Sequence, residues 1–95
     1  MTRLFAALLV GLLLLLPQTV AAEDLESLYG RALQASRSGD FVRALPLWDQ
    51  VLELSPNDAA ALSNRGNVRL ALGDSDGAIA DQTRSIELAP EEPDP

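Results

Sequence analysis

Apolar residues recur every three and four positions along most of this chain, which is the spacing of a helix with one buried face. In the first half the two apolar series are Leu25, Leu28, Tyr29, Ala32 and Leu33, then Phe41, Ala44, Leu45, Trp48, Val51 and Leu52. The second half repeats the spacing more weakly, with Leu62, Gly66 and Leu70 followed by Ala78, Ile79, Ile86 and Ala89. The pattern predicts an all-α fold with helices near residues 24–38, 41–54, 58–72 and 75–88.

The two halves are copies of one unit, offset by 34 positions. Identical pairs across this offset are Leu28 and Leu62, Arg31 and Arg65, Gly39 and Gly73, Asp40 and Asp74, Ala44 and Ala78, Glu53 and Glu87, Leu54 and Leu88, and Pro56 and Pro90. The register does not slip over this range. Each unit is therefore interpreted as one two-helix module that is used twice.

Turn residues fall at matching places in the two units. Gly39 and Gly73 can adopt the left-handed conformation that ends a helix, and the aspartate after each glycine can cap the next helix. Pro56 stops the second helix of the first unit, and Asn57 or Asp58 can cap the helix that follows. The turn signals and the apolar period therefore predict the same four helices.

A helix-turn-helix period of 34 residues, with small residues in both helices, Gly-Asp at the turn and a closing proline, resembles the tetratricopeptide repeat family. The residues that carry the resemblance are Leu28, Ala32, Gly39, Ala44, Trp48 and Pro56 in the first unit and Leu62, Gly66, Gly73, Ala78 and Pro90 in the second. The resemblance implies an α-solenoid fragment of two repeats, 25–58 and 59–92, in a domain that covers residues 23–90. The small residues would let the two helices of a unit cross closely.

Three features depart from the family's pattern. Arg31 and Arg65 stand where an aliphatic residue is usual. Pro46 lies inside the predicted helix 41–54 and removes a backbone donor, so a kink near Val42 or a helix that begins near Leu45 is the alternative to a regular helix there. Only two units are present, whereas about three are normally needed to bury the apolar faces of such repeats, so the module alone is expected to be marginally stable.

The first 22 residues have the three parts of a secretory signal peptide, and we assign 1–22 to it. Arg3 precedes an apolar run from Leu4 to Leu16, and small residues lead to Ala22. Because the run is shorter than the roughly 20 residues that cross a bilayer, we expect cleavage after Ala22, or after Ala21, in preference to a retained anchor. Export would place the protein in a periplasm, a lumen or the medium.

Composition restricts the functions that remain. The chain has seven basic and 14 acidic residues, a net charge of −7, no histidine and no cysteine. Without Arg3 the mature charge would be −8, and residues 91–95 form an acidic, proline-rich tail. Such a charge disfavours nucleic acid and anionic membranes. Because the commonest general base, metal ligand and thiol nucleophile are missing, we expect no catalytic, cofactor-binding or metal-binding residue and predict that the protein is not an enzyme.

The resemblance places a binding surface on the concave side, which the first helix of each unit lines. Its candidate residues are Tyr29, Leu33 and Ser36 in the first unit and Ser63, Asn64, Asn67 and Leu70 in the second. Asn64 and Asn67 are the sharpest candidates because an amide can both donate to and accept from a peptide backbone. The alternative is helix surface with local hydrogen bonds. Of the side chains with which some family members clamp a terminal carboxylate, only Asn64 is matched, so no such clamp is expected.

Three further residues each have two interpretations. Arg65 and Arg69 lie one turn apart and could bind an acidic group, but a solvated pair balanced by acids on the neighbouring helix is more common. Trp48 could stack on a ligand, but its place in an apolar stripe indicates a core residue.

Two functions fit these features. In the first, the protein is an exported adaptor that holds a protein or peptide on its concave face. In the second, the last helix leaves Ile79 or Ile86 uncovered, and the chain is an assembly unit or a fragment of a longer repeat protein that completes its fold by stacking on a partner or on its own copy. The expected partner is a protein or peptide, and a homo-oligomer is the alternative. We expect no binding of nucleic acid. We also expect no stable membrane span after signal cleavage.

Overall fold

The computed structural model describes residues 23–89, which form four α-helices and no strand. They are α2 (Leu25–Arg37), α3 (Phe41–Leu54), α4 (Ala59–Ala71) and α5 (Ser75–Leu88). The all-α prediction is confirmed, and each predicted helix end is within one residue of the observed end. The predicted signal peptide and the acidic tail lie outside the described residues. Within that range no helix has the length and apolar character needed to cross a bilayer.

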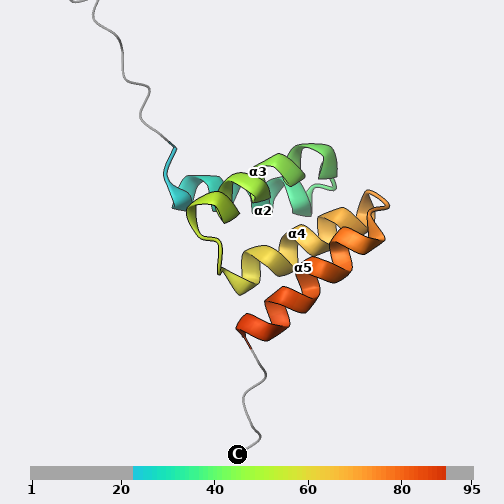
Figure 1. Cartoon of the computed structure of the whole chain (residues 1–95). Coiled ribbons are helices and arrows are strands. Elements are labelled where there is room, and N and C mark those ends of the chain that lie inside the picture. The colour runs from blue at the N-terminus through green and yellow to red at the C-terminus, as the bar shows by residue number, and fades with distance from the viewer. Residues whose placement is uncertain (1–22, 90–95) are drawn as a thin grey trace, which may run out of the picture.

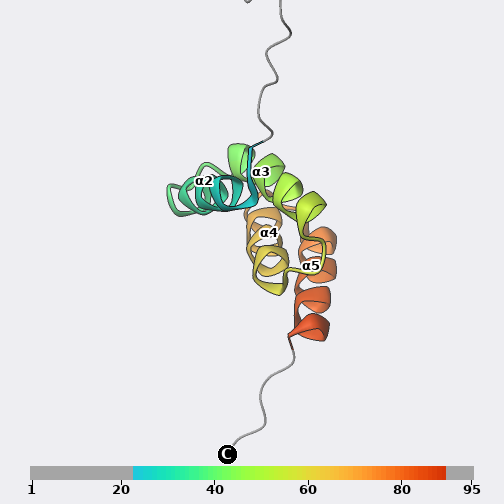
Figure 2. The same cartoon turned by 90° about the vertical axis from the view of Figure 1, so that its left-hand side faces the viewer.

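The four helices pack in chain order. Each helix contacts the next one, α2 also contacts α4, and within the described range α5 contacts α4 alone (Figures 1 and 2). Because a short turn joins consecutive helices, neighbours run in opposite directions, as Figure 1 shows for α2 with α3 and for α4 with α5. The arrangement is that of two helical hairpins laid side by side, with α2 and α5 at its two ends.

Aspartates begin all four helices. The carboxylates of Asp24, Asp40, Asp58 and Asp74 accept hydrogen bonds from the backbone N–H groups of Ser27, Arg43, Ala61 and Gly77, respectively. Each bond satisfies one of the amides that a helix start leaves without a partner. The backbone amide of Ser27 lowers the pKa of Asp24, because its hydrogen bond favours the charged carboxylate. Of the two caps expected before α4, Asp58 is the one that the structure uses.

Glycines end the first helix of each hairpin. Gly39 has φ 77° and Gly73 has φ 88°, in the left-handed region that glycine adopts without steric cost. The residue after each glycine donates its backbone N–H to a carbonyl five residues earlier: Asp40 to Ala35 at 2.9 Å and Asp74 to Arg69 at 2.8 Å. These bonds form the Schellman turn that the Gly-Asp pairs predict.

Pro46 does not delay the start of its helix. α3 begins at Phe41, so the alternative of a helix that begins near Leu45 is wrong. The Asp40 cap holds the first turn in place, and the one hydrogen bond lost to the proline is the bond that residue 46 would donate to the Val42 carbonyl. Val42 is 78% exposed, so it lies on the side of α3 where water is available to its carbonyl.

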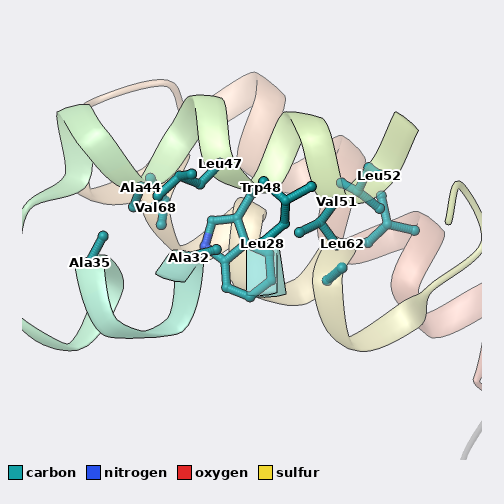
Figure 3. Packing of buried hydrophobic residues seen from close by; sticks show 11 residues of the cluster. Leu28, Ala32, Ala35, Ala44, Leu47, Trp48, Val51, Leu52, Leu62 and Val68 are labelled. Atoms are coloured by element: carbon teal, nitrogen blue, oxygen red, sulfur yellow. The ribbon is translucent and has the colours of Figure 1, made fainter. Parts of the chain in front are cut away.

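The apolar core lies between α2, α3 and α4. Its buried members are Leu28, Ala32, Ala35, Ala44, Leu47, Trp48, Val51, Leu52, Ala61, Leu62 and Val68. Trp48 is fully buried near the middle of the cluster, and this confirms its assignment to the core (Figure 3). No residue of α5 belongs to the buried part of this cluster, although Leu88 packs against it from the edge.

The contact between α4 and α5 is polar, in contrast to that between α2 and α3. The 34-residue offset pairs the buried Leu47, Trp48 and Val51 of α3 with Asp81, Gln82 and Ser85 of α5. The amide of Gln82 donates to the carbonyl of Ser63 at 3.0 Å. The hydroxyl of Ser85 donates to the carbonyl of Ala59 at 2.7 Å. The second hairpin therefore keeps the geometry of the first while hydrogen bonds replace much of its apolar contact.

Gly66 shows why one small residue is needed in this second contact. A Cβ atom at this position would lie 2.7 Å from the Nε2 atom of Gln82, which is closer than real Cβ contacts allow. Gly66 thus makes room for the Gln82 side chain.

Candidate functional site

A shallow hollow of about 320 Å³ lies where α2 and α4 face the start of α3. We call it the α2–α4 hollow, and its lining residues are Leu33, Ser36, Arg37, Phe41, Asn64, Asn67 and Val68. Leucine, phenylalanine and valine give it apolar surface, while the amides, the hydroxyl and the guanidinium provide hydrogen-bonding groups. A binding site that holds a peptide segment combines these two kinds of surface.

Four of the seven candidate residues line this hollow together: Leu33, Ser36, Asn64 and Asn67. They come from the first helix of each hairpin, α2 and α4, which is where the resemblance places them. Asn67 also accepts a hydrogen bond from Gln82 at 3.1 Å, so its amide oxygen is already in use, whereas its NH₂ group remains as a donor.

The other three candidates lie elsewhere. Ser63 faces α5, where its hydroxyl donates to the Oε1 atom of Gln82 at 3.3 Å. Leu70 is 61% exposed near the end of α4 and does not line the hollow. Tyr29 is half-buried and packs its ring edge-to-face on Trp48, with the ring centroids 5.1 Å apart. Of these three, Tyr29 is linked to the hollow, because its ring packs on Trp48 and Trp48 donates a hydrogen bond to Ser36 in the lining.

Tyr29, Trp48 and Ser36 connect the core to the hollow. The indole N–H of Trp48 donates to the hydroxyl of Ser36 at 2.9 Å, so this serine supports the core as well as lining the site. Burial raises the pKa of Tyr29, and the carboxylate of Asp58 raises it further, while the amide of Asn64 acts in the opposite direction. The hydroxyl of Tyr29 is therefore neutral at ordinary pH.

Sequence reasoning missed three residues of the hollow. Phe41 had been counted with the apolar stripe of its own helix, yet it is only half-buried and lines the hollow. Val68 pairs across the 34-residue offset with the polar Gln34, so comparison of the two units did not indicate that Val68 lines the hollow. Arg37, in the last turn of α2, could have been found because a surface cation beside a predicted binding helix is a candidate contact for an acidic group.

Arg65 and Arg69 converge on one buried carboxylate. Asp81 is 4% exposed. It accepts two bonds from Arg65, at 2.8 and 2.9 Å, and one from Arg69, at 2.8 Å. The expectation of acids on the neighbouring helix was right, but the expectation of a solvated pair was wrong, since the two arginine side chains are only 19% and 25% exposed.

Arg65 has a second ion pair, with Asp49 of α3 at 3.1 Å. The hydrogen bond to Asp81 is the main cause that raises the pKa of Arg65, partly offset by burial, and the charges of Asp81 and Asp49 raise it further. Because their charges are already balanced by these carboxylates, Arg65 and Arg69 connect α3, α4 and α5 and are not available as a receptor for an external acid.

A second hollow, of about 440 Å³, opens at the junction of α3 and α4. Its lining residues are Asp49, Leu52, Glu53, Pro56, Leu62 and Arg65. Although it is larger than the α2–α4 hollow, its arginine is engaged with Asp49 and Asp81, and none of the seven candidate residues of the concave surface lines it. Over residues 23–89, no group of three or more acidic side chains is placed to hold a metal ion.

Comparison with known proteins agrees with this arrangement. A tetratricopeptide repeat family model matches residues 29–93. The chain is similar to the protein SGT1 homolog of Oryza sativa subsp. japonica, 39% identical over 72 residues, which is 76% of this chain and 19% of that protein. It is also similar to tetratricopeptide repeat protein 36 of Homo sapiens, 34% identical over 67 residues, which is 70% of this chain and 35% of that protein. The chain thus spans between a fifth and about a third of the length of these relatives.

Proposed function

The chain belongs to the tetratricopeptide repeat family, and we propose that it is an exported module that binds another protein or a peptide in the α2–α4 hollow. Domains of this family generally bind proteins and are generally non-catalytic scaffolds. The observation that carries the proposal is the meeting of Leu33, Ser36, Asn64 and Asn67 from two helices around one hollow with both apolar and amide surface. A peptide laid across α2 and α4 would contact all four.

The absence of histidine and cysteine from the sequence supports a binding function without catalysis. The abundance of acids supports a protein or peptide partner, because 14 acids against seven basic residues disfavour nucleic acid. We place the two repeats at 25–58 and 59–92, so that each contributes one wall of the hollow.

Capture of the partner by the tagged chain, followed by affinity measurement with the purified pair, tests the site. We expect Asn64→Ala to weaken binding by about two- to twelvefold, the effect of one lost hydrogen bond of about 0.5–1.5 kcal/mol. The matched control is Gln34→Ala, which removes an exposed amide that lies on α2 but outside the hollow. Equal affinity of the two variants would place the partner elsewhere on the protein.

Export depends on residues 1–22 and has a separate test. We expect the C-terminally tagged chain to be recovered from the exported fraction with a mass that begins at Glu23, because the apolar run is shorter than a membrane span and is followed by small residues. Replacing Leu12 with arginine in the apolar run should keep the chain uncleaved inside the cell. Recovery of an unprocessed chain from the soluble interior in both cases would refute export.

A further inference from the structure

The outward side of α5 is an uncovered apolar surface at the end of the helix array. Within residues 23–89, α5 contacts α4 alone, and Figures 1 and 2 both show it at the edge away from α2. Ile79 is 65% exposed and Ile86 is 66% exposed. We call Ile79, Thr83 and Ile86, which lie along one side of the helix at spacings of four and three, the α5 outer face.

The equivalent face of α3 in the first hairpin shows what kind of element covers such a face. The 34-residue offset pairs Ile79 with Leu45 and Ile86 with Leu52. Leu45 packs against the core and Leu52 is 7% exposed, because α4 lies over α3 at the junction that Leu52 lines. The corresponding positions on α5 have the same apolar character, and no helix of residues 23–89 lies over them. Their pattern therefore fits one further helix.

The charged residues around the α5 outer face indicate which charges a bound helix carries. Asp76 and Glu87 are exposed on the same side of α5, one turn before Ile79 and next to Ile86. Glu87 accepts a bond from Arg84 of its own helix at 3.4 Å, but both side chains are more than half exposed, and such pairs contribute little. At the α3–α4 contact, Glu53, the counterpart of Glu87, lines the junction together with Arg65 of the covering helix, and Arg65 pairs with Asp49. A helix that covers α5 would be matched in the same way by basic residues.

A second copy of this chain fits the face poorly. Two α5 helices that met antiparallel would bring Ile79 of one copy against Ile86 of the other. The same contact would bring Asp76 and Glu87 of one copy near the same acids of the other, and these like charges repel in a chain whose net charge is already −7. The outward residues of α2, the other end of the array, include Ser27, Gly30 and Gln34, which are exposed and offer no apolar side chain to cover the isoleucines.

We propose that the α5 outer face binds one amphipathic helix of a different protein, with apolar side chains at spacings of three and four and arginine or lysine along one edge. The isoleucines supply the apolar contact, and Asp76 and Glu87 select the charge of the bound helix. This surface is separate from the α2–α4 hollow, and the proposal stands whether or not a peptide binds there.

The test uses the full chain and a pair of capped synthetic helical peptides. Both carry leucines at spacings of three and four, and one has arginine and the other glutamate along the edge of the leucine stripe. Calorimetry is expected to show saturable one-to-one binding of the arginine peptide, and at least tenfold weaker binding of the glutamate peptide. Ile79→Glu and, separately, Ile86→Glu should each lower the affinity for the arginine peptide at least tenfold.

Val42→Glu is the matched control, because Val42 is 78% exposed on α3 and lies away from this face. Val42→Glu should bind the arginine peptide like the unaltered chain, and so should Asn64→Ala, which separates this surface from the hollow. Circular dichroism confirms that each variant is folded. Equal binding of the two peptides, or binding that survives Ile79→Glu, overturns the proposal. A dimer in sedimentation that Ile79→Glu dissociates also overturns it, because the face would then be covered by a second copy.

Discussion

Replacing Trp48 with alanine is expected to leave the protein largely unfolded at room temperature. The indole is fully buried, packs edge-to-face on Tyr29, and donates to Ser36. Removing a buried aromatic side chain costs about 3–5 kcal/mol. A core of this size rarely supplies more than about 3–5 kcal/mol of stability in total, so the loss consumes most of it.

Helicity in urea, followed by far-ultraviolet circular dichroism, measures this effect. Fluorescence cannot follow the variant because Trp48 is the only tryptophan. Trp48→Phe keeps an aromatic ring in the core and loses the bond to Ser36 and part of the buried indole volume, so it should cost less than Trp48→Ala. Val42→Ala, at an exposed position of the same helix, should change the stability by less than about 0.5 kcal/mol. A Trp48→Ala chain as stable as Val42→Ala would contradict the packing described for the core.

The second large effect is expected for Asp81→Ala, which should destabilise the fold by about 3 kcal/mol. The change removes the carboxylate to which Arg65 and Arg69 donate three hydrogen bonds, and it leaves two guanidinium groups that are no more than one quarter exposed. Arg69 would keep only Asp74, at 3.9 Å. Two largely buried guanidinium groups without their carboxylate partner destabilise the folded state. On unfolding, α5 should therefore separate from α4 before the other helices separate.

Asp49→Ala is the matched control, because it removes the other carboxylate that pairs with Arg65. The Asp49 side chain is 48% exposed, so its loss should cost less than about 1 kcal/mol. Urea denaturation of both variants gives the comparison. If Asp81→Ala were as mild as Asp49→Ala, the cluster would not hold α5 in place.

The first hairpin suggests a compensating variant for the same experiment. Leu47 occupies the position in α3 that Asp81 occupies in α5, and Ala35 occupies the position of Arg69. Combining Asp81→Leu with Arg65→Leu and Arg69→Ala replaces the charged group by apolar side chains. This triple variant should recover most of the stability lost in Asp81→Ala, because apolar packing can replace a buried ion pair without net cost.

The ends of the helices are determined by neighbours in the sequence, and the sequence predicted them within one residue. A capping aspartate acts on an amide three residues away, and Gly39 and Gly73 act on the turn in which they lie. The 34-residue repeat then implied two hairpins of the same kind, and Trp48 fell on the buried face because a helix turns its side chains at a fixed period. These inferences need no knowledge of distant contacts.

Only the tertiary structure decided how the second hairpin is held together and which residues meet at the hollow. Asp81, Gln82 and Ser85 are polar residues that the apolar pattern leaves out, and they become contact residues because α4 places hydrogen-bonding groups opposite them. Phe41 and Val68 enter the hollow because α2, α3 and α4 meet at that point. Such pairings join residues far apart in the chain, and their energy depends on burial and on a partner within hydrogen-bonding distance, which appear only when the helices pack.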